Sequence, residues 1–180
     1  MIKEFEKRIL SSIILLPLSF YFILKGSFFF LFFLSICFLT TSYEWYMMSK
    51  KKSYHLYGYL FLILSFYSAY KLRGEDEGGL IIFLIIIIIC ISTDLGGYIC
   101  GKIFKGPKLT KISPNKTYAG MFGSYIFSII AVYILIINFN LFGFDNEFFT
   151  VEIFIIVFIV STISQIGDLI ISYFKRLSKI

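Results

Sequence analysis

The stretch Leu80 to Ile91, LIIFLIIIIICI, decides the fold class of this 180-residue chain. The stretch is apolar without a break, so no helical or strand periodicity separates a wet face from a buried one. The whole chain is 58% hydrophobic and 21% aromatic, with a mean hydropathy of +0.86, whereas soluble domains are only about half apolar. This composition excludes a water-soluble globule and predicts an all-α protein, a polytopic transmembrane helical bundle.

Apolar runs predict about six membrane helices within a single transmembrane domain over residues 1–180. They lie at about 9–24, 28–43, 56–70, 80–95, 120–137 and 151–171. A helix needs about 20 residues to cross the hydrocarbon, and only Lys25, Gly26 and Ser27 separate the first two runs. A hairpin that is partly re-entrant therefore stays open as an alternative for this pair.

The basic residues are distributed unevenly between the two sides of the predicted helices. Of the 17 Lys and Arg residues, only Lys25, Lys71 and Arg73 fall on one side. Basic flanks stay in the cytoplasm, so we expect a multi-pass protein integral to the cell (inner) membrane, with both termini and the loop 98–119 cytoplasmic. Basic loops of this kind meet lipid or substrate phosphate, and the net charge of +6 does not imply binding to nucleic acid.

Histidine and cysteine offer little chemistry. His55, the only histidine, follows three lysines in a predicted loop, where a solvated or headgroup-facing ring is expected. The cysteines, Cys37, Cys90 and Cys100, are odd in number and lack CxxC spacing, so we expect free thiols.

Two aspartates lie in or beside apolar runs, where an ionisable group is a functional candidate by default. Asp94 ends the fourth run, and helical spacing aligns it with Gly97, Tyr98 and Gly101. The alternative is that Gly97 and Gly101 form a GxxxG packing pair while Asp94 is solvated at the interface. Both interpretations stay open at this point.

The end of the sixth run places a carboxylate, a hydroxyl and two cations on one helix face. These are Asp168, Ser172, Lys175 and Arg176, at positions i, i+4, i+7 and i+8. A Lys-Arg pair alone is typical of a cytoplasmic anchor, but an aspartate one to two turns deeper needs a partner or a metal ion. We therefore interpret this face as functional.

Between these helices runs the loop GPKLTKISPNKTYAG, residues 106–120. Its prolines break helix, and it supplies lysines, hydroxyls and an amide. Lys116 lies just before the fifth run, where free backbone N–H groups favour an anion. The loop suits phosphate; the alternative is a basic loop on anionic headgroups.

Three blocks, in this order, resemble the phosphatidate cytidylyltransferase (CDP-diacylglycerol synthase) family. Residues 94–101 are similar to its Asp-x-x-Ala-Tyr-x-x-Gly helix end, with Gly97 for Ala, and residues 113–120 to its Ser-Pro-x-Lys-Thr-x-Glu-Gly loop, with Ala119 for Glu. Residues 167–176 are similar to the opening of its C-terminal signature. In the family the signature continues with Lys-Asp, Pro-Gly-His-Gly-Gly and Asp-Arg-x-x-Asp, whereas this sequence stops at Lys179-Ile180. The resemblance thus implies a truncated signature without its second metal-binding aspartate, in a fragment or a degenerate copy that is inactive as it stands.

The resemblance implies nucleotidyl transfer from CTP to phosphatidate, giving CDP-diacylglycerol and pyrophosphate, with Mg²⁺ as cofactor. It makes Asp168 a metal ligand and Asp94 a contributor. Phosphates would be held by Lys116, Lys175 and Arg176, and hydrogen bonds supplied by Ser113, Asn115, Thr117 and Ser172. Alternatives are a polyprenol kinase-like or archaeal-type lipid enzyme, or a noncatalytic membrane protein such as a small transporter or scaffold; a homodimer stays open.

Overall fold

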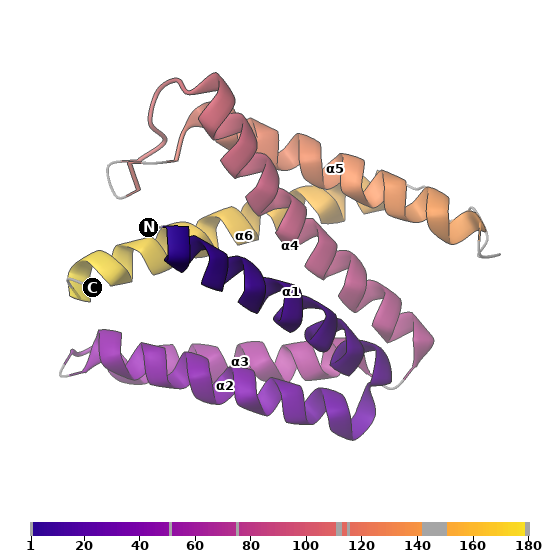
Figure 1. Ribbon diagram of the computed structural model, residues 1–180, viewed down its shortest axis with the longest axis horizontal. Helices are drawn as coiled ribbons and strands as arrows, with labels where there is room; N and C mark the ends of the chain where they lie inside the picture. Colours follow the sequence, from indigo (N-terminus) through magenta and orange to yellow (C-terminus); the bar gives the residue numbers. More distant parts are fainter. Residues whose placement is uncertain are drawn as a thin grey trace. The chain divides into compact units, whose positions relative to one another are not determined.

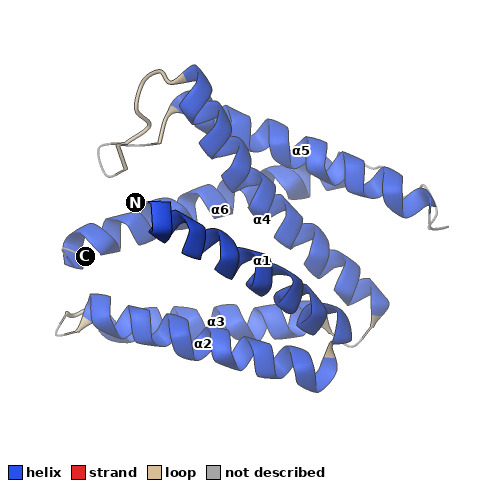
Figure 2. Ribbon diagram, in the orientation of Figure 1, coloured by secondary structure: helices blue, strands red, loops and turns tan. Residues whose placement is uncertain are grey.

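The computed structural model describes residues 2–50, 52–74, 76–110, 113–114, 116–141 and 151–178. In that part of the chain the regular structure is helical, which confirms the all-α class (Figure 1 and Figure 2). The helices are α1 (Ile2–Lys25), α2 (Ser27–Ser49), α3 (His55–Arg73), α4 (Glu77–Phe104), α5 (Tyr118–Leu141) and α6 (Val151–Ser178). Each predicted apolar run lies within one of them.

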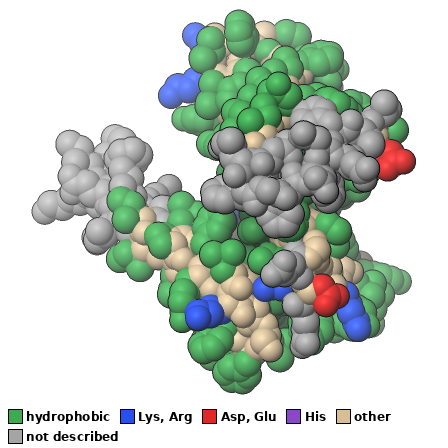
Figure 3. Space-filling model, turned by 90° about the vertical axis from the view of Figure 1, so that its right-hand side faces the viewer, with side chains coloured by type: hydrophobic (Ala, Val, Ile, Leu, Met, Phe, Trp, Pro, Cys, Tyr) green, Lys and Arg blue, Asp and Glu red, His purple; other side chains and the backbone are tan. Residues whose placement is uncertain are grey.

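Four of these helices are long and apolar enough to cross a membrane. The spans are Ser27–Ser49, Gly78–Phe104, Tyr118–Ile137 and Glu152–Ser178, in α2, α4, α5 and α6. The prediction of about six membrane helices is confirmed for these four; the apolar stretch described in α1, Ile13–Lys25, is shorter. Large hydrophobic side chains are exposed along the helices, and Figure 3 shows them over most of the coloured surface. The chain is a membrane protein.

Helix α4 is longer than the sequence predicts. It continues past Asp94 to Phe104, so the loop expected to begin at Tyr98 begins at Lys105. The glycines after Asp94 do not end the helix, and the predicted loop boundary at Tyr98 is wrong. Gly96, Gly97 and Gly101 instead provide close contact with α5, and this packing offsets their low helix propensity.

The chain divides into two compact units, of which the first is Met1–Phe83. In this unit α2 packs against both α1 and α3. The buried Arg73, 5% exposed, donates to the carbonyl oxygens of Ile23 at 2.9 Å and Leu24 at 3.4 Å. These carbonyls end α1 and lack intrahelical donors. Gly26 follows with φ of +64°, and a Cβ there would lie 2.5 Å from the Arg73 guanidinium, so the turn requires glycine.

The turn between α2 and α3 corrects the interpretation of His55. His55 begins α3 and is half-buried, rather than solvated in a loop. Its Nδ1 lies 2.7 Å from Oγ of the buried Ser49, and its carbonyl oxygen accepts a hydrogen bond from Trp45 Nε1 at 2.9 Å. His55 therefore links α2 to α3 through these two hydrogen bonds. The three cysteines of the chain are free thiols.

The second unit, Leu84–Ile180, contains the rest of α4 together with α5 and α6. Its apolar core joins Ile89 of α4, Val132 and Ile136 of α5, and Val157 of α6. Between this core and the loop that joins α4 to α5, the backbones of these two helices come into direct contact. A Cβ on Gly96 would lie 2.5 Å from the carbonyl oxygen of Gly123.

The α4–α5 crossing gives a testable expectation for stability. Gly96→Ala is expected to lower the free energy of unfolding by about 1–3 kcal/mol, as overpacking does, because its methyl would meet the α5 backbone. Gly167→Ala in α6 is the matched control: within the described residues a Cβ there meets nothing within 4 Å, and alanine favours helix by up to about 1 kcal/mol. Unfolding in detergent would compare the two, and equal effects would contradict the close crossing.

Candidate active site

A cavity of about 230 Å³ opens in the second unit, between α4, the loop before α5, α5 itself and α6. Charged and neutral polar side chains share its lining with glycines and apolar groups. The lining residues are Thr93, Asp94, Gly97, Tyr98, Leu109, Lys116, Thr117, Gly120, Met121, Ser124, Gln165 and Asp168. Segments distant in sequence thus combine at one place, as in most ligand sites.

One end of the cavity is charged. Lys116 Nζ lies 2.9 Å from Asp168 Oδ2, which joins the loop to α6 across 52 residues of sequence. Both side chains remain partly open to solvent, at 28% and 53% exposure. Asp94, on α4, lines the same cavity. The cavity therefore gathers two carboxylates and one ammonium group, enough to attract a cation and an anion together.

Backbone hydrogen bonds within the loop fix the position of Lys116. Its carbonyl oxygen accepts from Leu109 N at 2.8 Å, and its own N–H donates to the Ser113 carbonyl at 3.0 Å. The next residue, Thr117, accepts the N–H of Gly120 on its Oγ1 at 3.1 Å, which is the geometry of a helix N-cap. The loop thus folds back on itself and delivers Lys116 at the start of α5.

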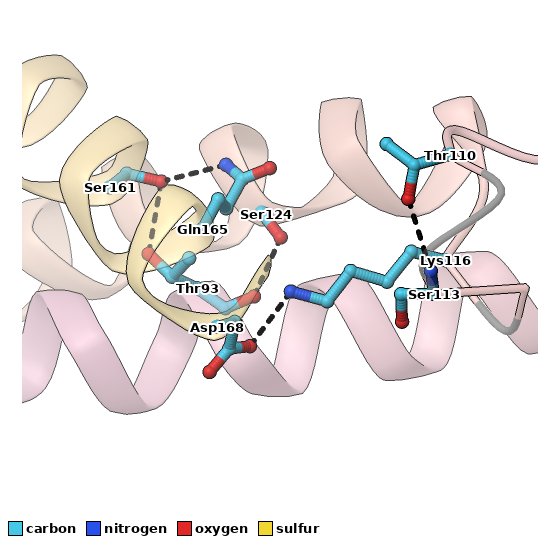
Figure 4. A network of polar contacts seen from close by, with 8 residues as sticks. All are labelled: Thr93, Thr110, Ser113, Lys116, Ser124, Ser161, Gln165 and Asp168. Atoms are coloured by element: carbon cyan, nitrogen blue, oxygen red, sulfur yellow. Dashed lines mark hydrogen bonds and ion pairs between the residues drawn. The ribbon is translucent and has the colours of Figure 1, made fainter. Parts of the chain in front are cut away.

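The other end of the cavity is polar but uncharged (Figure 4). Thr93 Oγ1 donates to Ser161 Oγ at 3.0 Å, and Ser124 Oγ donates to the Thr93 carbonyl at 2.7 Å. Gln165 Nε2 donates to the same Ser161 Oγ at 3.4 Å. Thr93 and Ser161 are buried, at 1% and 0% exposure. These bonds tie α4, α5 and α6 together where water is excluded.

The structure brings part of the predicted site together. Asp94, Lys116, Thr117 and Asp168 line the cavity. Ser113 is outside the lining and donates its N–H to Thr110 Oγ1 at 3.2 Å. Ser172, Lys175 and Arg176 lie further along α6 and are not in the lining. Asn115 lies outside the described residues.

The structure shows the glycine packing of the alternative interpretation, while a functional role of Asp94 stays a prediction. Gly97 and Gly101 pack against α5, where their Cβ atoms would meet Ser124 Oγ at 2.8 Å and Thr117 Oγ1 at 3.3 Å. Asp94 nevertheless lines the cavity. The close approach that the glycines allow is what brings Asp94 towards the loop and its lysine.

Among the polar lining residues, sequence reasoning missed Thr93, Ser124 and Gln165. A usable signal was present for Gln165, because it is a polar residue in an apolar run and lies three positions before Asp168, on the same helix face. Thr93 and Ser124 gave a weaker signal, since small hydroxyl residues are common wherever membrane helices pack.

The donors in the cavity fit a hard divalent cation. Mg²⁺ commonly takes one or two carboxylates and completes its shell with water and substrate phosphate. Asp94 and Asp168 supply such a pair, and their neighbours in the lining add hydroxyl oxygens. Within the described residues no three His, Cys, Asp or Glu side chains cluster as a complete protein cage, so such an ion would depend on substrate oxygens.

Comparison with known proteins identifies relatives across the chain. A family described as "Cytidylyltransferase family" matches residues 53–180. The chain is 37% identical to the phosphatidate cytidylyltransferase of Rickettsia typhi over 134 residues, 72% of this chain and 58% of the relative. It is 36% identical to that of Rickettsia conorii over 179 residues, 94% of this chain and 74% of the relative.

A more distant relative is the phosphatidate cytidylyltransferase of Staphylococcus saprophyticus, 35% identical over 116 residues, 63% of this chain and 41% of the relative. The matches thus span from about two fifths to three quarters of the relatives' length. No solved structure matches the chain. The family match and the Rickettsia relatives confirm the resemblance that the three sequence blocks carry, and the chain belongs to the cytidylyltransferase family.

Proposed function

We propose that the protein transfers a cytidylyl group from CTP to phosphatidate. An oxygen of the phosphatidate phosphate attacks the α-phosphorus of CTP, the bond to the β-phosphate breaks, and CDP-diacylglycerol and pyrophosphate result. The names of the relatives support this reaction. The observation that carries the proposal is the ion pair of Lys116 with Asp168 in a cavity that Asp94 also lines.

The charges in the cavity suit two polyanionic substrates. Catalysis of transfer at phosphorus depends mainly on positioning and on electrostatic stabilisation of the developing charge. In this proposal Lys116 leaves Asp168 and contacts a phosphate of the bound substrate. The partial exposure of both groups makes that exchange inexpensive, because exposed ion pairs contribute only about 0–1 kcal/mol.

Asp168, with Asp94 as a contributor, would hold Mg²⁺. When bound, the ion would neutralise phosphate charge and orient the α-phosphate for attack. Further cations lie along α6: Lys175 and Arg176 follow Asp168 by two turns and are exposed. In this proposal they contact the outer phosphates of CTP. Ser172, Ser113, Asn115 and Thr117 would add hydrogen bonds around the phosphates.

We infer that the helices cross the inner membrane several times, with both termini in the cytoplasm. The uneven distribution of basic residues supports this orientation. In this orientation the loop between α4 and α5 would lie on the cytoplasmic side, where CTP is available, and phosphatidate would reach the cavity laterally from the bilayer.

Replacement of the charged pair tests the reaction. Asp168→Asn in the full-length protein should reduce CTP-dependent release of pyrophosphate with phosphatidate by at least about 100-fold, the loss typical of a removed electrostatic contact. Lys116→Met should also reduce it strongly. The controls are Asp76→Asn and Lys50→Met, which make the same two substitutions at exposed positions outside the cavity. Both should retain activity.

Stability measurements keep the result interpretable. Because the pair is partly exposed, loss of either partner should change the free energy of unfolding by no more than about 1 kcal/mol. Folded Asp168→Asn and Lys116→Met proteins with wild-type turnover would refute the assignment of the site.

Reporter fusions test the orientation. Fusions at Lys52, Glu77 and Asn146 should report cytoplasm, outside and outside, because the basic flanks stay in the cytoplasm. Lys52 precedes α3 and Glu77 begins α4, so the two fusions flank α3, and a cytoplasmic signal from both would mean that α3 does not cross. Asn146 lies outside the described residues.

A further inference from the structure

The cavity changes in chemical character along its length. Lys116 and Asp168 form its charged end. Thr93, Ser124 and Gln165 belong to the uncharged end, called the neutral end below. Gln165 lies three residues before Asp168 on α6, which is about 4.5 Å along a helix axis. Ser124 is seven residues into α5 from Thr117, away from the loop. The neutral end is therefore the deeper end within the apolar spans.

Most hydrogen-bond donors at this neutral end are already used. Ser124 donates to the Thr93 carbonyl, and Thr93 donates to Ser161. Gln165 differs, because its amide nitrogen carries two protons and Ser161 accepts one of them, at 3.4 Å. Gln165 therefore keeps one N–H for a ligand in the cavity that it lines.

The group that this donor would bind can be inferred from the order of the chemical groups along phosphatidate. The phosphate is at one end, two ester carbonyls follow within a few bonds, and the acyl chains continue into the hydrocarbon. A lipid whose phosphate lies at Lys116 and whose chains enter the bilayer brings an ester carbonyl to the neutral end. An ester carbonyl accepts hydrogen bonds and bears no charge, so an amide N–H is its complement.

We propose that Gln165 is a lipid-specificity residue, which donates a hydrogen bond to an ester carbonyl of the phosphatidate glycerol backbone. The Thr93–Ser161 bond holds the acceptor that orients the glutamine amide. This inference rests on the proposed function, since it deepens the description of the same site. The competing occupant is the nucleotide base, which would have to pass the charged residues from the loop end to reach Gln165.

The test compares two lipids that differ only in the ester carbonyls. Diacyl phosphatidate and its dialkyl ether analogue, with equal chain lengths, are supplied with saturating CTP to the full-length protein in mixed micelles. The wild type should prefer the ester lipid in kcat/KM by between about twofold and tenfold, the effect of one neutral hydrogen bond. Gln165→Leu should lose this preference, with the KM for CTP unchanged.

Two further variants make the comparison decisive. Gln165→Glu keeps the shape of the side chain but has no N–H when ionised, so it should also lose the preference even if Gln165→Leu does not fold. Ser164→Ala is the matched control, because Ser164 is the half-buried neighbour of Gln165 and is not in the cavity lining. It should keep the wild-type ratio.

Binding of the two lipids without CTP separates this inference from the proposed reaction. In nanodiscs, native mass spectrometry should show preferential retention of diacyl phosphatidate by the wild type but not by Gln165→Leu. That result without any turnover would contradict the proposed reaction and support the lipid contact. An unchanged ester-to-ether ratio in both Gln165 variants, or a raised KM for CTP with an unchanged ratio, would overturn the inference.

Discussion

The close crossing of α4 and α5 is the constraint on which the site depends. Gly96 faces Gly123, and Gly97 faces Gly120, so closely that a Cβ on Gly96 or Gly120 would lie less than 3 Å from a backbone oxygen of the facing helix. In a membrane such contact is favourable, because packing and short polar contacts replace the hydrophobic effect between helices. The crossing places Asp94 of α4 beside the residues that begin α5. Larger residues there would separate the carboxylate from Lys116.

Hydroxyl groups hold the third helix against this pair. The bond from Thr93 to Ser161 joins α4 to α6, and the bond from Tyr125 to Thr162, at 3.0 Å, joins α5 to α6. A hydroxyl buried without a partner costs several kcal/mol in an apolar medium, roughly 2–7 depending on the reference state. The partners of these groups are on neighbouring helices, so the polar contacts specify which helix faces meet. Asp168 consequently reaches the loop that carries Lys116.

Charge made part of the site predictable from sequence. Asp94 and Asp168 stood out because ionisable groups are rare in apolar runs. Lys116 stood out because it lies just before the fifth run, where helix N-terminal N–H groups favour an anion, and all three line the cavity. Their positions relative to one another could not be derived from the sequence. The ion pair joins residues that are 52 positions apart, and it depends on how the helices cross, which the spacing of residues along the chain does not predict. Gln165 was missed because an uncharged amide has a smaller desolvation cost and gives a weaker signal. The loop was expected to begin at Tyr98, whereas α4 continues to Phe104 with its glycines packed against α5.

The two ends of the cavity differ in how readily their contacts can be replaced. The Lys116–Asp168 pair is partly exposed, so water and ions compete with it and its net stabilisation is small. Thr93 and Ser161 are buried, and loss of their bond would leave a donor without water to replace it. A ligand can therefore exchange partners with the charged residues while the neutral end keeps its shape. That division suits the proposed reaction, in which phosphates are bound and released while the lipid backbone stays at a fixed depth.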